Sequence, residues 1–136
     1  MTRDDRLDDI DDYVRMLDDI YERETAEFTG KIILLGFSQG VATVCRWYRF
    51  GKIKPDVFIM WAGVFPPDLP LENELTPLKD SANYVVIGDQ DEFYGESRKN
   101  LILNEIREKG IKFDLLTFNG KHVIEPSILS ELKNRL

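Results

Sequence analysis

Apolar positions along the chain follow two patterns, a helical spacing in some stretches and short continuous runs in others. The first stretch places its apolar residues three or four positions apart, on one face of a helix: Leu7, Ile10, Val14, Leu17 and Tyr21. Further helices are expected at 39–50, at 96–109 and from Pro126 to the end of the chain. Continuous apolar runs predict buried strands at 32–35 and 57–61, and strand-like runs predict two more strands at 83–88 and 111–118.

Strands that alternate with helices predict a parallel sheet, because parallel strands need a crossover connection that is usually a helix. Right-handed crossovers place helices on the faces of the sheet. The expected fold class is therefore α/β, with three α/β/α layers and a parallel sheet of about four strands. Inward-facing positions are expected on two of the helices, at Val41, Val44, Cys45, Tyr48, Leu101, Ile102 and Ile106. Residues 62–80 include four prolines, which preclude a regular helix there.

The composition is that of one domain, spanning residues 1–136. A chain of 136 residues with 43% hydrophobic residues can bury a core of its own. No run of 18 or more apolar residues predicts a membrane span, and the charged residues 2–6 do not resemble a secretory signal. The only cysteine, Cys45, has no partner for an internal disulfide, which favours a core role and a reducing, cytoplasmic location.

Charge patterning narrows the classes of partner. The net charge is −7, whereas binding to a phosphate backbone depends on clustered Lys and Arg, so no nucleic-acid partner is expected. A small basic group lies near the end of the helix 39–50, where cations suit the helix dipole: Arg46, Arg49, Lys52 and Lys54. The aspartate pairs before residue 20 predict a solvated helix face. The acidic run 89–92 lacks the spacing of a calcium loop, so no metal is expected there.

The motif Gly36-Phe37-Ser38-Gln39-Gly40 stands between a predicted strand and a predicted helix. A G-x-S-x-G pattern at such a junction is typical of a nucleophile elbow, in which a tight turn lifts the serine Oγ clear of the sheet. Both glycines are expected at points where a Cβ would clash between the strand and the helix. The alternative is a structural role, in which Ser38 caps the helix.

One histidine and two aspartates further along the chain have the chemistry needed to activate this serine. His122, the only histidine, follows the predicted strand 111–118 and an Asn-Gly turn. Asp89 and Asp91 come directly after the predicted strand 83–88. These side chains therefore follow the carboxyl ends of parallel strands, where open α/β sheets place their sites.

The chemistry of nucleophilic catalysis defines a role for each residue type. A histidine takes the proton from the serine, and an aspartate orients the imidazole and stabilises its charged form. Only one of Asp89 and Asp91 is expected to act in this way, and the other would be a turn residue. His122 as an ordinary surface-loop residue is the structural alternative.

Four short motifs together resemble the phospholipase/carboxylesterase family, which includes acyl-protein thioesterases and small bacterial carboxylesterases. They are Gly36-Phe37-Ser38-Gln39-Gly40, Trp61-Ala62-Gly63, Gly88-Asp89-Gln90-Asp91 and Gly120-Lys121-His122, and the resemblance extends over residues 7–136. It implies an α/β-hydrolase fold, of which the four predicted strands would be the last four. The chain order of serine, aspartate and histidine is the order of that fold.

The resemblance assigns catalytic roles to particular residues. The second aspartate of the family's Gly-Asp-x-Asp motif is the catalytic acid, and it corresponds to Asp91. The nucleophile and the base correspond to Ser38 and His122. The backbone N–H of Gln39, which follows the nucleophile, would donate one hydrogen bond in the oxyanion hole.

The segment after Trp61-Ala62-Gly63 helps to wall the acyl pocket in the family. Substrate-binding residues are therefore expected at Val64, Phe65 and Leu69, with packing of a satellite core under the loop as the alternative. The sequence has no His-Gly-x-Gly loop, which supplies the second oxyanion donor in the family. We accordingly expect the chain to be the C-terminal part of the fold.

These observations predict a serine hydrolase that cleaves carboxylic esters or thioesters through an acyl-enzyme, without a metal or an organic cofactor. The alternatives are a truncated or inactive hydrolase-like domain with a binding-only role, and a peptidase on the same fold. If no strand precedes residue 1, the strand 32–35 would lie at an open edge of the sheet, which predicts self-association into a homo-oligomer.

Overall fold

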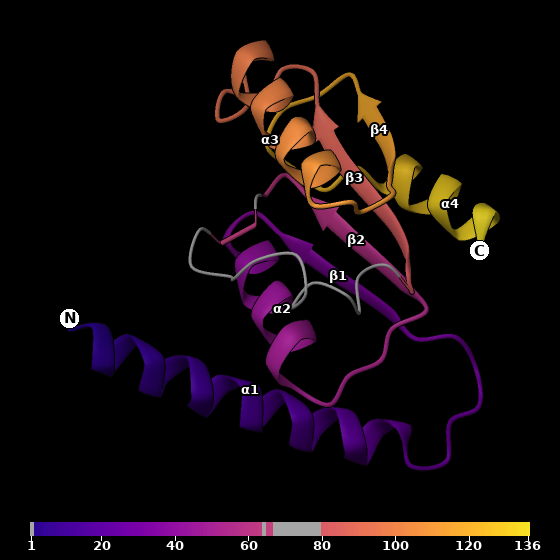
Figure 1. The fold of residues 1–136 in the computed structure, drawn as a ribbon. Helices are drawn as coiled ribbons and strands as arrows, with labels where there is room; N and C mark the ends of the chain where they lie inside the picture. Colours follow the sequence, from indigo (N-terminus) through magenta and orange to yellow (C-terminus); the bar gives the residue numbers. More distant parts are fainter. Residues whose placement is uncertain (1, 64, 67–79) are drawn as a thin grey trace.

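The computed structural model describes residues 2–63, 65–66 and 80–136 (Figure 1). Within these ranges the elements follow one another as α1 (Arg3–Thr25), β1 (Ile33–Phe37), α2 (Gln39–Phe50), β2 (Val57–Trp61), β3 (Ala82–Gly88), α3 (Glu96–Glu108), β4 (Asp114–Phe118) and α4 (Pro126–Arg135). The strands form one parallel sheet in the order β1-β2-β3-β4. The predicted α/β fold class with a parallel sheet is confirmed.

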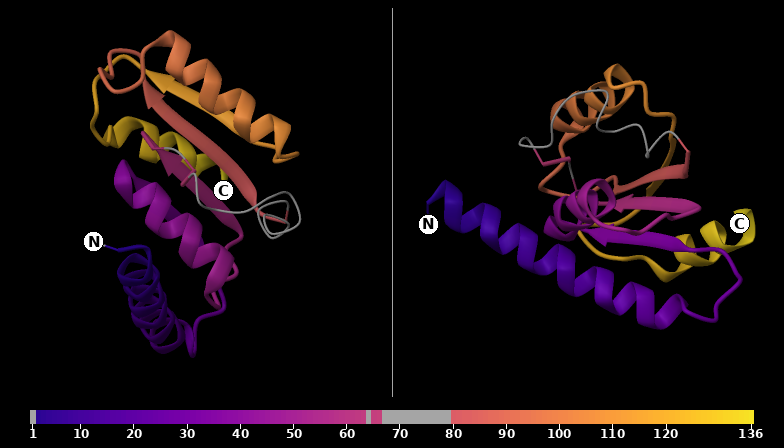
Figure 2. Two further views of the ribbon diagram at one scale, coloured as in Figure 1. Left: turned by 60° about the vertical axis from the view of Figure 1, so that its left-hand side comes forward. Right: turned by 60° about the horizontal axis from the view of Figure 1, so that its bottom comes forward.

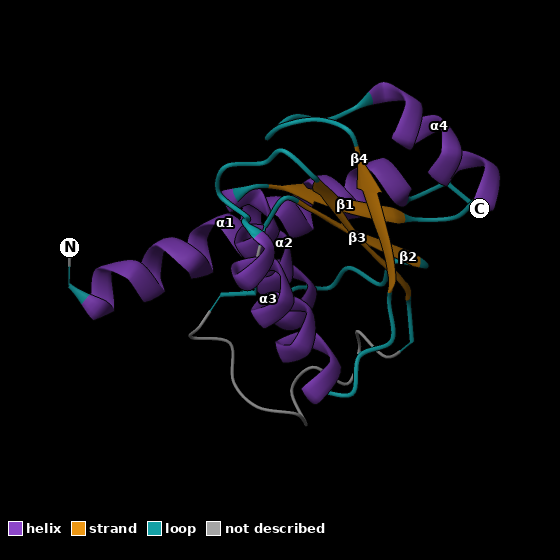
Figure 3. Cartoon of the chain, turned by 90° about the horizontal axis from the view of Figure 1, so that it is seen from above, coloured by secondary structure: helices purple, strands orange, loops and turns teal. Residues whose placement is uncertain are grey.

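Helices cover both faces of the sheet (Figures 2 and 3). α2 and α3 bury Val41, Cys45, Ile102 and Ile106 against one face, and α4 buries Leu132 against the other. β2 is buried at every position and β3 at all but its first, because both lie between neighbouring strands and between helix layers. The edge strands β1 and β4 keep exposed positions. The molecule therefore has the three layers that the sequence predicts.

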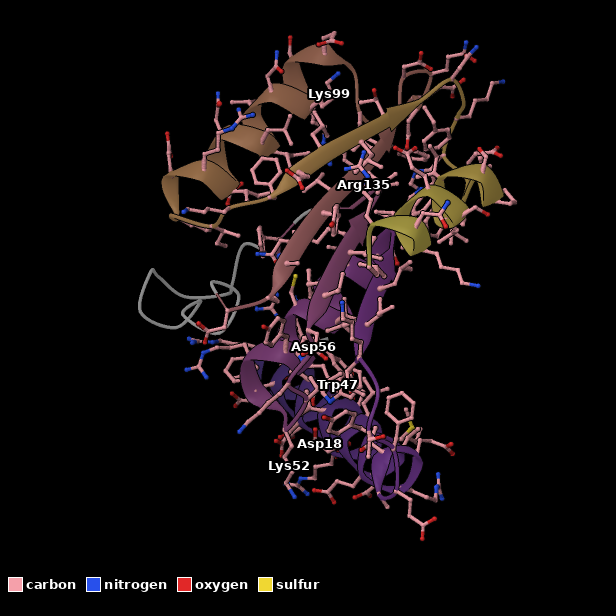
Figure 4. All side chains as sticks on the ribbon, turned by 90° about the vertical axis from the view of Figure 1, so that its right-hand side faces the viewer. Asp18, Trp47, Lys52, Asp56, Lys99 and Arg135 are labelled. Carbon is pink, nitrogen blue, oxygen red and sulfur yellow. The ribbon has the colours of Figure 1, made fainter. Side chains whose placement is uncertain are left out.

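α1 packs against α2 through a polar junction that Figure 4 labels. The Asp18 carboxylate accepts hydrogen bonds from the Trp47 indole at 2.9 Å and from the Lys52 amide at 2.7 Å. Leu7, expected on the buried face, is 46% exposed, because the first turns of α1 extend beyond α2 (Figure 1). Across the described ranges, no helix combines the length and the apolar character needed to cross a membrane.

Two local predictions need correction. Leu101, expected to face inward from α3, is 70% exposed, and Leu103 is buried in its place. The strand expected from residue 111 begins at Asp114. Ile111 is buried, although it precedes the strand, and the carbonyl of Lys112 accepts a hydrogen bond from the Asn83 side chain instead of joining the sheet ladder.

The single cysteine behaves as a core residue, as its place in an apolar helix predicts. Cys45 lies in α2 with no exposed surface and packs in the core on that face of the sheet. Burial raises the pKa of its thiol far above the ordinary value, because desolvation disfavours the thiolate. An inert, protonated thiol follows.

Candidate active site

Ser38 lies at the junction between β1 and α2 in a conformation that non-glycine residues rarely adopt. Its φ is 56° and its ψ is −123°, and its amide donates a hydrogen bond to the Trp61 carbonyl at 2.8 Å. Strained backbone of this kind persists where the surroundings over-determine it, and it is frequent at functional sites. The Ser38 side chain makes no capping hydrogen bond to α2, so the helix-capping alternative does not describe its contacts.

Two glycines let the backbone of this turn pass close to its neighbours. A Cβ on Gly36 would lie 2.8 Å from the Gly40 carbonyl oxygen and 2.8 Å from Val41 Cα, and a Cβ on Gly63 would clash with the Ser38 carbonyl. A Cβ on Gly40 would meet nothing within 4 Å. The expectation that both motif glycines relieve clashes is therefore right for Gly36 and wrong for Gly40, and the second close approach occurs at Gly63.

Three side chains that are far apart in the sequence form one chain of hydrogen bonds. His122 Nε2 lies 2.8 Å from Ser38 Oγ, and His122 Nδ1 lies 2.8 Å from Asp91 Oδ2. The ionised carboxylate only accepts hydrogen bonds, so Nδ1 carries the proton and Nε2 accepts from the serine hydroxyl. Asp91 is 3% exposed, and its other oxygen accepts from the Phe93 amide at 3.0 Å.

Asp89, the other candidate acid, bonds to backbone rather than to the imidazole. Its carboxylate accepts from the Gly120 amide at 3.1 Å. Gln90 adds two hydrogen bonds between the same loops, from its amide to the Gly120 carbonyl at 2.8 Å and from its side chain to Asn119 at 2.9 Å. The loop after β3 and the loop after β4 are thereby joined, which holds Asp91 and His122 at a fixed separation.

Aromatic side chains surround the imidazole. The rings of Phe37, Phe93 and Tyr94 have centroids 5.1, 4.7 and 6.3 Å from that of His122. The indole of the buried Trp61 donates to the Val123 carbonyl at 2.9 Å, next to His122 in the chain. Sequence reasoning assigned none of these residues to the site, although Phe93 and Tyr94 stand directly after Asp91 and could have been placed by that adjacency.

A cavity of about 400 Å³ opens beside Ser38 and His122. Its volume is in the range of sites for small organic ligands. Its walls are partly apolar or aromatic and partly cationic: Ala42, Pro66, Phe93, Tyr94, Arg46 and Arg98. Gln39 also lines it, and as the first residue of α2 its amide has no acceptor within the helix.

The residues expected to bind substrate have different outcomes. Phe65 is 6% exposed and packs in the core formed with α2 and α3, and its neighbour Pro66 lines the cavity. Val64 and Leu69 lie outside the described residues. In the part of the chain that is described, no three His, Cys, Asp or Glu side chains are placed to hold a metal ion.

Comparisons with known proteins give matches among solved structures. No protein-family model matches the chain, and no curated protein does. An uncharacterized protein from Bacillus cereus ATCC 10987 is similar, with TM-score 0.74, 26% identity and coverage of 94% of this chain and 43% of that one. Esterase PE8 has TM-score 0.65 and 21% identity, with 93% and 62% of the two chains covered.

A third similar structure is described by its name as an alpha/beta hydrolase. MGS-M1, an alpha/beta hydrolase enzyme from a Medee basin deep-sea metagenome library, matches with TM-score 0.57 and 16% identity over 85% of this chain and 58% of its own. The chain therefore has an α/β-hydrolase fold, as its resemblance to the phospholipase/carboxylesterase family implied. It spans about 43% to 62% of the length of these three neighbours.

Proposed function

We propose that the protein is a serine hydrolase that cleaves carboxylic esters or thioesters. The observation that carries the proposal is the hydrogen-bonded chain from Ser38 Oγ through His122 to Asp91, with both links at 2.8 Å. Ser38, at one end of this series of hydrogen bonds, lies at a strained turn, and both Ser38 and His122 line a cavity. Esterase PE8 is an esterase by name, which agrees with this class of reaction.

In the proposed reaction, Ser38 Oγ attacks the carbonyl carbon while His122 Nε2 takes the hydroxyl proton. The negative charge that develops on the carbonyl oxygen is stabilised by the amide of Gln39. His122 then protonates the leaving alcohol or thiol, and an acyl group remains on Ser38. Water, activated by the same imidazole, releases the acid, while Asp91 keeps the ring oriented and stabilises the imidazolium. No metal or organic cofactor takes part.

One donor of the oxyanion site is assigned and a second is not. Loss of one oxyanion donor costs about 10²- to 10³-fold in rate. A binding-only role is therefore the second candidate. A peptidase with the same nucleophile would be distinguished by its turnover of amides.

Labelling with a fluorophosphonate tests the proposal without knowledge of the substrate. An activated Ser38 should displace fluoride and gain a phosphonyl group, seen as one adduct by intact mass and located on Ser38 by peptide mapping. Ser127, a serine that bonds to Glu125 rather than to a histidine, provides the internal control. A folded protein with no adduct would contradict catalysis and favour the binding-only role.

We also propose that copies of the chain associate through the edge of the sheet. Within the described residues β1 pairs with β2 alone, and Ile33 at its start is 48% exposed. An exposed apolar strand edge favours pairing with another chain. Light scattering at increasing concentration should show a dimer or a larger species, and Ile33→Lys should reduce it. A monomer at all concentrations would contradict this prediction.

The proposed location is the cytoplasm. It depends on the single, fully buried Cys45, which forms no disulfide within the chain.

A further inference from the structure

The cavity beside Ser38 has a cationic wall, although the chain as a whole carries a net charge of −7. Arg46 reaches it from α2 and Arg98 from α3. Two guanidinium groups at one small cavity in an acidic protein are a local reversal of the overall charge. Such a reversal concentrates and orients a ligand of negative charge.

Arg46 lies on the same face of α2 as the residues that follow the proposed nucleophile. Gln39, Ala42 and Arg46 occupy positions i, i+3 and i+7 of α2, so they share one face that runs from the turn at Ser38 along the helix. Arg46 is seven residues from Gln39, or about 10 Å along the axis, and long helical side chains point back toward the N-terminus. Its charge is thus within reach of the far end of a short substrate.

Arg98 is held by an aromatic ring that also neighbours His122. Its Cζ lies 5.2 Å from the centroid of Tyr94, and the same ring stacks 6.3 Å from the imidazole. Desolvation by burial raises the pKa of Tyr94, so the ring is a neutral phenol near pH 7, and the face of such a ring attracts a cation. One aromatic ring therefore separates this guanidinium from the proposed base.

The described residues contain no carboxylate that forms an ion pair with Arg98. Glu96, two residues before it, is paired with Lys99 at 3.0 Å. Asp91, which is also near Tyr94, is committed to His122. The planar fork of an arginine matches a carboxylate through two parallel hydrogen bonds, and this match gives orientation as well as attraction.

We propose that the substrate is an anionic ester, which carries a carboxylate that Arg98 recognises, with Arg46 adding to the positive field of the wall. This inference depends on the proposed function, because it names the class of ester that Ser38 would cleave. The carboxylate stands on the acyl part or on the alcohol part of the ester, a few bonds from the reacting carbonyl.

Matched pairs of esters test the proposal and separate the two placements of the charge. For the acyl side the pair is mono-4-nitrophenyl adipate and its methyl ester, and for the alcohol side 4-acetoxybenzoate and its methyl ester. The quantity compared is the ratio of kcat/KM for the anionic and the neutral ester within each pair. Comparison of this ratio between variants cancels the intrinsic reactivity of each ester.

Arg98→Gln should lower the ratio about fivefold for one of the two pairs, which is the upper end of what an exposed charge pair contributes. Arg98 lines the cavity, so its replacement affects both esters of a pair, and the ratio isolates the effect on the charged one. Arg107→Gln is the matched control, because Arg107 also lies on α3 over an aromatic ring, that of Phe113 at 5.4 Å, and does not line this cavity. Added salt should lower the ratio in the parent and in Arg107→Gln, but little in Arg98→Gln.

A binding measurement keeps the proposal testable even if hydrolysis is absent. The single histidine gives one set of imidazole NMR signals, so titration with monomethyl adipate or dimethyl adipate reports on binding at His122. The anion should bind more tightly than the diester in the parent and in Arg107→Gln, and equally in Arg98→Gln. Equal binding in the parent, or equal losses in both variants, would overturn the inference. Failure of the proposed function would appear separately, as no fluorophosphonate adduct and no Ser38-dependent turnover.

Discussion

Replacing Ser38 by alanine is expected to abolish hydrolysis of 4-nitrophenyl butyrate, with a fall in kcat of about 10⁴- to 10⁶-fold. The reason is that, among the described side chains, the proposed nucleophile is the Ser38 hydroxyl, which lies 2.8 Å from His122 Nε2. His122→Ala should cause a similar fall. The double variant should be no worse than either single variant, because such residues act as a unit. Release of nitrophenolate, measured on variants of unchanged thermal stability, checks this expectation.

The two aspartates of the same loop provide a matched pair for this experiment. Asp91→Asn should lower kcat by about 10⁴-fold, because an asparagine oxygen does not stabilise an imidazolium and its NH₂ group favours the wrong tautomer of His122. Asp89→Asn keeps an oxygen that can accept from the Gly120 amide and should lose little activity. Equal effects of the two substitutions would contradict the assignment of Asp91. Unchanged turnover in Ser38→Ala would remove the serine from the mechanism.

The sequence predicts the sheet well because β1 and β2 are continuous apolar runs and β3 and β4 are mostly apolar. β2 and β3 are buried on both faces, and their sequences are apolar apart from Asn83, which donates a hydrogen bond to the Lys112 carbonyl. The run from residue 111 is less clear. Ile111 is buried by packing rather than by strand pairing, and periodicity does not distinguish these two reasons for an apolar residue.

The amphipathic face of α3 shows a second limit of sequence patterns. Leu101, Ile102, Leu103 and Ile106 are all apolar, and the sequence alone does not say which of the two leucines beside Ile102 turns inward. The structure buries Leu103 and exposes Leu101, because the axis of α3 is set by its packing on the sheet. Tertiary contacts determine which of these side chains are buried, whereas local spacing only limits the set of candidates.

Some parts of the candidate site are likewise predictable from the sequence, whereas others depend on packing. The G-x-S-x-G turn and the loops after β3 and β4 are recognised from local signals, and the parallel sheet brings their ends together. The walls of the cavity come from α2, from Pro66 and from the start of α3, and no local signal marks Ala42 or Arg98 as neighbours. Distances between such elements depend on the packing of whole helices, which the sequence pattern does not specify.

The two glycines of the elbow motif are expected to respond in opposite ways to the same substitution. Gly36→Ala should lower the free energy of unfolding by about 3 kcal/mol, at the upper end of the usual cost of overpacking. The added methyl would lie 2.8 Å from the Gly40 carbonyl oxygen and 2.8 Å from Val41 Cα. These are backbone atoms, which cannot relieve the clash by a change of rotamer as a side chain can. A shift of α2 away from β1 is the remaining response, and it would displace Ser38 from His122.

Gly40→Ala is the matched control, four residues further along the same motif. Its Cβ would meet nothing within 4 Å, and alanine is a better helix former, so stability should stay unchanged or rise by about 0.5 kcal/mol. Urea unfolding of both variants gives the two free energies, and fluorophosphonate labelling of Ser38 shows whether the turn keeps its geometry. Equal destabilisation by both substitutions would mean that the motif needs its glycines for another reason than the contact between β1 and α2. A stable Gly36→Ala variant with full labelling would mean that α2 can move without loss of the Ser38–His122 hydrogen bond.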